Sequence, residues 1–409
     1  TERTMNPRID RLHPYPFERL AALIEDVRPP AELARIALSI GEPRDPAPDF
    51  VVRTLADPAA QARSLGTYPA TRGSEALRET ISDWLRHRFR LDAGMIGPDR
   101  VLPVNGTREA LFAFAQAQLD GHGDDCVLMP NPFYQIYEGA ALLAGAEPVY
   151  VPCPASTGFL PDLDAVDAAS WQRCALFYVC SPGNPSGAVM DTGDWQRLLE
   201  LADRHDFVIA ADECYSELYA DEANPPTGLL QACAELGRHD LSRVMVFHSL
   251  SKRSSLPGLR SGFVAGDAGL IERFLRYRTY HGCAMPALHQ QASALAWANE
   301  THVVANRAAY RARFDAVLEI LGDALEVARP EGGFYLWPRT PVDDETFTRD
   351  LLAATNVLVL PGSYLSRGSG DDDPGAHRVR MALVAEQEEC VEAARRIRGF
   401  LGGQAGVRD

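Results

Sequence analysis

The chain has 409 residues, of which 46% are hydrophobic and 23% charged, so it is long enough to form one large domain with a buried core and a smaller companion domain. Its formal net charge of −16 argues against nucleic acid or an anionic membrane as the main partner. The sequence has no apolar run of about 18 residues, no signal-peptide pattern and no Cys-x-x-Cys spacing among its eight cysteines. We therefore expect a cytoplasmic protein with reduced thiols and no metal. Whether the four residues before Met5 are native stays open.

The first 50 residues predict an N-terminal arm, because they are too few to bury a core alone. Apolar residues at helical spacing predict a short helix within 17–27, and 36–40 has the pattern of a strand that leads into Gly41. After a helix that begins near Val51, the turn-rich loop 66–73 carries Tyr68. The apolar residues of 75–89 then recur with the period of a helix.

From residue 100 onward strand and helix patterns alternate, which predicts a mixed, mostly parallel sheet with helices on both faces. Ligands of such sheets bind at the carboxyl ends of the strands, where the motifs discussed below lie. The predicted strands are 101–103, 126–129, 148–151, 175–179, 208–211 and 244–247, and the predicted helices are 110–119, 136–144 and 195–204.

The C-terminal part predicts a smaller α+β domain. The helical pattern 287–300 is followed by a longer one, 302–321, which is long enough to bridge two domains. We therefore predict an arm over 1–50 that joins the small domain, a large domain over 51–290 and a small domain over 291–409. Within the last we predict strands at 325–328, 333–337, 357–360 and 377–381, helices at 344–354 and 386–401, and a flexible loop at 366–375.

Lys252 is the only lysine among the 40 basic residues of the chain. Arginine can replace lysine wherever only charge is needed, but it stays protonated and cannot act as an amine nucleophile. Codon bias that spared one surface lysine would give the same composition. The neighbouring residues favour chemistry, because Ser249, Ser251 and Arg260 place hydroxyls and a guanidinium where a phosphate could be held. A lysine beside a phosphate site is what pyridoxal phosphate requires to form a Schiff base.

Other candidates lie at strand ends. Gly106, Thr107 and Arg108 open a helix and could form an anion site, although Gly-Thr before a helix is commonly only a cap. Asp212 ends a buried strand, where a carboxylate needs a cation such as a pyridinium N–H; the alternative is a helix N-cap.

Three further polar or aromatic residues could contact the same flat ring. Tyr215 and Asn184 could reach its phenolate oxygen, whereas Tyr134 could stack on its face, with core packing as the alternative for Tyr134. Tyr68 lies in the loop 66–73, where an aromatic side chain could have the purely structural role of capping a core.

Together these motifs resemble the class I/II aminotransferases of the fold-type I pyridoxal-phosphate enzymes, over nearly the whole chain from Gly41 to Arg380. The resemblance implies that Lys252 is the Schiff-base lysine and the acid/base that moves the substrate proton. It further implies three ligand sets: Asp212, Tyr215, Asn184 and Tyr134 on the cofactor ring; Gly106, Thr107, Arg108, Ser249, Ser251, Arg260 and the neighbouring subunit's Tyr68 on its phosphate; and Gly41, Asn184 and Arg380 on the substrate carboxylate. A tyrosine lent across subunits implies a homodimer with shared active sites.

Two stretches, 130–140 and 248–263, resemble the N-succinyldiaminopimelate aminotransferases of bacterial lysine biosynthesis, which use glutamate as amino donor. Gln135 stands where a second proline is common, which leaves open whether Phe133 or Tyr134 stacks on the cofactor. We expect a transaminase for a dicarboxylic or acylated amino acid with 2-oxoglutarate. The distal carboxylate needs a cation, for which Arg72, Arg108 and Arg253 are the candidates.

Three other functions are compatible with a pyridoxal-phosphate site. The chain could be another class I/II aminotransferase, for aspartate or a different amino acid, or a C–S lyase of the same fold. A regulatory protein that binds the cofactor without turnover would carry an appended basic winged-helix domain, for which this acidic chain has neither the N-terminal length nor the charge.

Overall fold

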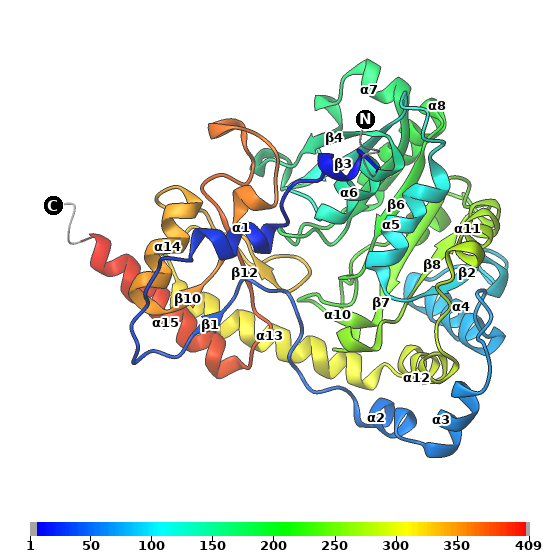
Figure 1. Ribbon diagram of the computed structural model, residues 1–409, viewed down its shortest axis with the longest axis horizontal. Helices are drawn as coiled ribbons and strands as arrows, with labels where there is room; N and C mark the ends of the chain where they lie inside the picture. Colours follow the sequence, from blue (N-terminus) through cyan, green and yellow to red (C-terminus); the bar gives the residue numbers. More distant parts are fainter. Residues whose placement is uncertain (1–5, 406–409) are drawn as a thin grey trace, which may run out of the picture.

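The computed structural model describes residues 6–405 and is built around a seven-stranded sheet (Figure 1). Strand β8 is antiparallel to both of its neighbours, and the other pairings are parallel. In the order in which they lie side by side, the strands are β2 (Val101–Val104), β8 (Gly262–Gly266), β7 (Val244–Ser249), β6 (Val208–Asp212), β5 (Cys174–Cys180), β3 (Cys126–Asn131) and β4 (Glu147–Pro152).

Helices cover both faces of this sheet, because side chains along each strand alternate between two cores. In β6, for example, Ile209 and Ala211 belong to one buried cluster, while Val208 and Ala210 belong to the other. The first cluster includes residues of α2 (Asp49–Leu55), α4 (Glu75–Phe89), α7 (Ala168–Arg173), α8 (Thr192–His205), α9 (Leu229–Glu235) and α12 (Ala287–Ala298), and the second includes residues of α5 (Thr107–Gln118), α6 (Gln135–Ala144) and α11 (Ala268–His281).

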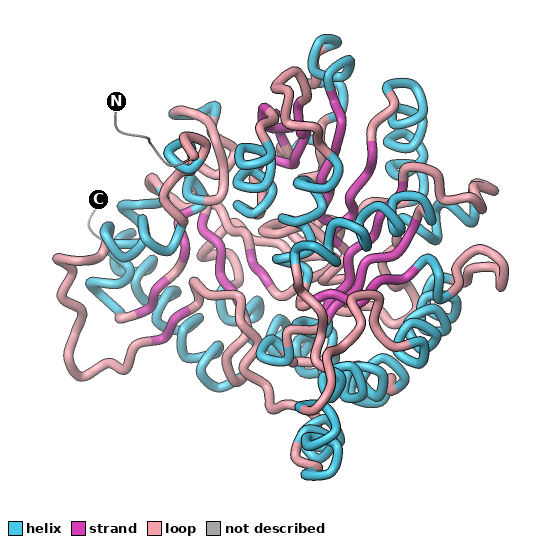
Figure 2. The backbone as a smooth tube through the Cα atoms, turned by 45° about the vertical axis from the view of Figure 1, so that its right-hand side comes forward, coloured by secondary structure: helices cyan, strands magenta, loops and turns pink. Residues whose placement is uncertain are grey.

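A smaller α+β region lies beside the large sheet, as the separate groups of strands in Figure 2 show. Here β1 of the N-terminal arm pairs in parallel with β10, so both ends of the chain contribute to this region. Its elements are α1 (Pro16–Leu23), β1 (Ile36–Ala37), β9 (Tyr335–Leu336), α14 (Asp344–Thr355), β10 (Val357–Leu358), β11 (Leu360–Pro361), β12 (Val379–Ala382) and α15 (Gln387–Ala405). The predicted fold class is therefore confirmed.

Helix α13 (Thr301–Leu321) connects the two regions. With 21 residues it is about 30 Å long, and Figure 1 shows it crossing from the neighbourhood of α12 to that of α15. Its residues Phe314, Val317 and Leu321 pack in the core of the smaller region. We propose the division into an arm (1–50), a large domain (51–290) and a small domain (291–409) on this basis.

Some local predictions were wrong or missing. The predicted strand at 325–328 is only an isolated bridge between Glu326 and Arg339. Strand β8 was missed because the glycines at its two ends are typical of turns. Helix α11, which follows β8 in the chain, was missed as well. The short helices α3 (Pro58–Leu65), α7 and α9 were also not predicted. Among the described residues no helix is long and apolar enough to cross a membrane, and the residues before Met5 lie outside the described part.

Candidate active site

A cavity of about 500 Å³ lies at the carboxyl ends of β5, β6 and β7, and the smaller region closes it from the other side. Twelve of the predicted site residues line it: Gly41, Thr107, Arg108, Tyr134, Asn184, Asp212, Tyr215, Ser249, Ser251, Lys252, Arg260 and Arg380. Gly106 lies directly beside Arg260.

Lys252 lies in the short helix α10 (Leu250–Arg253), immediately after β7. Its Nζ donates a hydrogen bond to the carbonyl oxygen of Gly41 at 2.6 Å and lies 5.0 Å from the centre of the Phe334 ring. Burial, together with the positive charge of Arg380, lowers the pKa of the Lys252 ammonium from 10.5 to about 8. A sizeable fraction of this amine is therefore neutral near pH 8 and able to act as a nucleophile.

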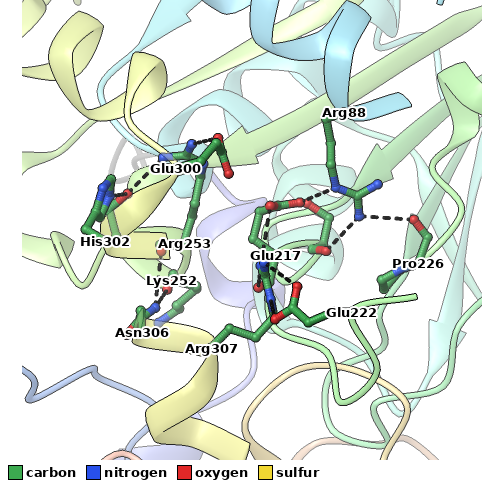
Figure 3. A network of polar contacts seen from close by, with 12 residues as sticks. Arg88, Glu217, Glu222, Pro226, Lys252, Arg253, Glu300, His302, Asn306 and Arg307 are labelled. Atoms are coloured by element: carbon green, nitrogen blue, oxygen red, sulfur yellow. Dashed lines mark hydrogen bonds and ion pairs between the residues drawn. The ribbon is translucent and has the colours of Figure 1, made fainter. Parts of the chain in front are cut away.

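The backbone of the Lys252 turn is fixed by the junction between α12 and α13 (Figure 3). Asn306 Nδ2 donates hydrogen bonds to the carbonyl oxygens of Lys252 and Arg253, each at 3.1 Å. The guanidinium of Arg253 donates to Ala296 O at 2.8 Å and pairs with Glu300. Since Arg253 is only 1% exposed and points away from the cavity, the prediction that it could bind a distal carboxylate is wrong.

A second group of ion pairs in Figure 3 holds the segment that follows β6. Arg88 of α4 donates to Glu217 Oε1 at 2.5 Å, and Arg307 of α13 donates to the carbonyl oxygen of Glu217 at 2.9 Å. Arg307 also pairs with Glu222. Helices from both sides thus fix the segment that begins with Asp212 and Tyr215.

Asp212 is the last residue of β6 and is only 3% exposed. Tyr137 Oη donates to Asp212 Oδ2 at 2.8 Å, and the backbone N–H of Cys214 donates to Oδ1 at 3.3 Å. Burial raises the pKa of Asp212 above its ordinary value. The chain continues as a turn, not as a helix, so the N-cap alternative is excluded. A buried carboxylate of this kind suits a cationic ligand in the cavity.

Groups that could bind an anion lie together where β2, β7 and β8 approach one another. Gly106 adopts φ +84° as the N-cap of α5, and a Cβ at this position would lie 2.2 Å from Arg260 Nη2. Ser249 Oγ donates to Ser251 Oγ at 3.0 Å. The N-terminus of α5, two hydroxyls and a guanidinium therefore converge here, which is the donor set that a phosphate requires.

Tyr134 lines the cavity, whereas the neighbouring Phe133 is buried in the core against Tyr150, with 5.3 Å between ring centres. Tyr134 Oη accepts a hydrogen bond from Arg108 Nε at 2.7 Å. Its ring also meets that of Tyr137 edge-on. This arrangement favours Tyr134 over Phe133 as the aromatic side chain that faces a bound ring.

Arg380 reaches the cavity from β12 and is held on three sides. Its Nη1 donates to Asn184 Oδ1 at 3.1 Å, and its Nη2 donates to the carbonyl oxygen of Ser39 at 2.9 Å. The guanidinium carbon lies 4.4 Å from the centre of the Tyr335 ring. A planar guanidinium held in this way can bind a carboxylate through two parallel hydrogen bonds.

Two predicted residues lie elsewhere. Tyr68 is 99% exposed and does not line the cavity of its own chain, which excludes the alternative that it caps a core. Arg72, a candidate for the distal carboxylate, pairs with Glu272 at 2.6 Å and is also outside the cavity.

Sequence reasoning missed several residues that line the cavity. Tyr15 comes from the N-terminal arm, where its hydroxyl accepts a hydrogen bond from Arg108 Nη2 at 3.2 Å. Tyr137 is one helical turn after Tyr134, a spacing that could have indicated it. The other missed residues with a polar side chain are Glu42, Gln135, Cys180, Cys214 and Tyr335.

The cavity fits pyridoxal phosphate: it offers an amine with a lowered pKa, a buried carboxylate for a ring nitrogen and an anion site formed around Gly106. The fold and the site together define a fold-type I pyridoxal-phosphate enzyme. Residues 35–397 match the family model for aminotransferase class I and II, and the chain belongs to this family.

The chain is similar to curated proteins and solved structures over nearly its full length. It is 32% identical to the LL-diaminopimelate aminotransferase of Desulforudis audaxviator and 31% identical to that of Moorella thermoacetica, with 97% of this chain covered in both and 97% and 98% of the relatives. A solved aminotransferase of Neisseria meningitidis superposes with a TM-score of 0.91 at 44% identity, covering 96% of this chain and 99% of that one. Aminotransferase AspB of Helicobacter pylori superposes with a TM-score of 0.86 at 33% identity, with the same coverage. The substrates of this enzyme are therefore amino acids and 2-oxo acids.

Proposed function

We propose that this aminotransferase acts on a diaminopimelate-type substrate and transfers its amino group to 2-oxoglutarate. The names of the curated relatives support the substrate class. Those names refer to free LL-diaminopimelate, so they do not support the N-succinyl form expected from the sequence. These curated relatives are all named aminotransferases, which supports transamination over the lyase and the regulatory alternatives.

Arg380 and Lys252 have the central tasks in the proposed reaction. Arg380 binds the substrate α-carboxylate, and Gly41, which has no side chain, lets the backbone approach this carboxylate. Bound pyridoxal phosphate supplies an electron sink that lets the substrate Cα lose a proton. Lys252 Nζ holds the cofactor at rest and moves this proton during the reaction, which its pKa of about 8 permits.

The observation that carries the substrate proposal is the set of charged lining residues that have no other task. Once Lys252, Asp212, Arg260 and Arg380 have their tasks, the charged side chains left among the described lining residues are Arg108 and Glu42. Arg108 donates to Tyr134 and Tyr15, and we propose for it a substrate role in place of the phosphate role expected from the sequence. One cation and one anion match the distal end of free LL-diaminopimelate, which has a carboxylate and an ammonium group. The N-succinyl form has two distal carboxylates and no ammonium, so it needs a second cation.

N-succinyl-LL-diaminopimelate is the second candidate, because the stretches 130–140 and 248–263 resemble enzymes specific for it. The deciding experiment mixes the cofactor-loaded enzyme with glutamate, LL-diaminopimelate or the N-succinyl form and follows the visible absorbance of the bound cofactor. We expect glutamate and LL-diaminopimelate to remove the visible band within one turnover. A response to glutamate and the N-succinyl form alone would select the second candidate, and a response to glutamate alone would refute the substrate class.

We also propose a homodimer in which Tyr68 of one subunit completes the active site of the other. Tyr68 and Leu65 are 99% and 88% exposed in the single chain, which is costly for apolar side chains unless another surface covers them. The test refolds or exchanges Lys252→Ala and Tyr68→Ala subunits together. Mixed dimers contain one intact site, so we expect about a quarter of the wild-type activity from two inactive parents. No recovery in dimers shown to be mixed would refute shared sites.

A further inference from the structure

Tyr335, which the sequence did not indicate, lines the cavity and contacts both Arg380 and Tyr215. It lies in β9 and pairs in the sheet with Ala382, two residues after Arg380. Its side chain is buried, at 4% exposure for the residue. The ring lies under the Arg380 guanidinium, and Tyr335 Oη is 3.1 Å from Tyr215 Oη.

A third contact connects Tyr335 with the N-terminal arm. A Cβ on Gly41 would lie 2.0 Å from Tyr335 Oη, so residue 41 must be glycine for the arm to pass this hydroxyl. The carbonyl oxygen of the same Gly41 accepts the hydrogen bond from Lys252 Nζ at 2.6 Å. The Tyr335 hydroxyl is therefore enclosed between Tyr215 and the segment that orients the lysine.

The direction of the Tyr335–Tyr215 hydrogen bond follows from what Tyr215 does in the loaded enzyme. In the role expected from the sequence, Tyr215 donates a hydrogen bond to the phenolate oxygen of the cofactor ring, so its own oxygen must accept the hydrogen bond from Tyr335. Burial raises the pKa of both hydroxyls above the ordinary tyrosine value, which keeps both as donors. A hydroxyl that accepts one hydrogen bond becomes a stronger donor in the next.

We propose that Tyr335 is a positioning residue that acts through Tyr215 on the cofactor and through its ring on Arg380. Its hydroxyl strengthens the hydrogen bond from Tyr215 to the cofactor oxygen, and its ring keeps the Arg380 guanidinium in the plane that binds the substrate carboxylate. The two effects are separable, because the hydroxyl serves the first and the ring serves the second. This inference rests on the proposed roles of Tyr215 and Arg380.

Other titratable groups near the Tyr335 hydroxyl do not compete in the relevant pH range. Besides Tyr215, the groups whose charge acts most on this hydroxyl are Arg380, Cys180 and Cys214. Burial raises the pKa of both thiols well above the ordinary value of 9.0, and arginine remains protonated. A change in the absorbance titration of the bound cofactor would therefore not arise from these groups.

The experiment compares Tyr335→Phe and Tyr335→Leu with a matched control, Tyr310→Phe. The hydroxyl of Tyr310 is also buried but has no hydrogen-bond partner among the described residues, and its ring stacks on Phe334. The first readout is the pKa obtained from the visible absorbance of the loaded enzyme, measured without substrate. The second readout is the KM for glutamate.

We expect Tyr335→Phe to raise the absorbance pKa by about 0.5 to 1, or roughly three- to tenfold in the proton equilibrium, because the phenolate oxygen loses stabilisation. Its KM should stay within about twofold, whereas Tyr335→Leu should raise KM about tenfold through loss of the ring beneath Arg380. An unchanged absorbance pKa in Tyr335→Phe, or an equal rise in Tyr310→Phe, would overturn the inference. If Tyr335→Leu does not fold, the Phe variant still decides. Since the first readout needs no substrate, failure of the proposed substrate class would be distinguishable.

Discussion

Replacing Arg380 with lysine tests the proposed carboxylate site, because the charge remains while the planar pair of donors is lost. The Arg380 side chain donates to Asn184 and Ser39 and lies over Tyr335 at 4.4 Å. A lysine ammonium can make one strong hydrogen bond to a carboxylate where the guanidinium makes two. One hydrogen bond to a charged group contributes about 1.5–3 kcal/mol, so KM should rise about 10- to 150-fold.

The assay is steady-state transamination from LL-diaminopimelate to 2-oxoglutarate, together with the cofactor content of each preparation. We expect Arg380→Lys to bind pyridoxal phosphate normally and to lose affinity for both amino-acid and oxo-acid substrates. Arg378→Lys is the matched control, because Arg378 donates to the carbonyl oxygen of Trp337 and does not line the cavity. An Arg380→Lys enzyme with wild-type KM would refute the assignment of the carboxylate to Arg380.

Four further outcomes are expected. Asp212→Asn should lower turnover more than about a hundredfold, measured with glutamate. The same substitution should stabilise the cofactor-free protein at neutral pH in thermal unfolding. Burial raises the folded pKa of Asp212, so the ionised carboxylate lowers the stability of the folded state as pH rises through that pKa, and asparagine removes this cost. Wild-type turnover would contradict the first expectation, and lower thermal stability would contradict the second. Labelling of the cofactor-free protein at its only lysine, followed by mass spectrometry, should rise with pH with a midpoint near 8, and a midpoint near 10.5 would show that Lys252 is not desolvated. Gly106→Ala should weaken cofactor binding at least about tenfold in an equilibrium titration, because a Cβ would lie 2.2 Å from Arg260 Nη2; unchanged affinity would remove Gly106 from the anion site.

The sequence indicated the alternation of strands and helices and most of the cavity, because these depend on local features. A buried strand that ends in Asp212, a glycine before a helix at Gly106 and the only lysine at Lys252 are each recognisable without knowledge of the fold. The carboxyl ends of parallel strands meet at one edge of the sheet, so residues at these ends were expected to lie together.

What could not be predicted depends on orientation and on distant partners. Neighbouring residues of a helix point about 100° apart, so Lys252 faces the cavity while Arg253 is buried beneath the α12–α13 junction. Tyr15 and Tyr335 join the site from the two ends of the chain, and no local pattern links them to Arg108 or Tyr215. The role of Tyr68 depends on a second subunit and remains a prediction.

The most direct test of the central claim is to treat the purified, cofactor-loaded enzyme with borohydride, which fixes pyridoxal phosphate covalently to the amine that holds it. Since the chain has one lysine, the only other primary amine is the N-terminus. We predict that peptide mass spectrometry finds one cofactor per chain, on the peptide that contains Lys252, and that prior incubation with glutamate prevents the attachment. Attachment at the N-terminus, or none at either amine, would contradict the assignment of Lys252 and the function built on it.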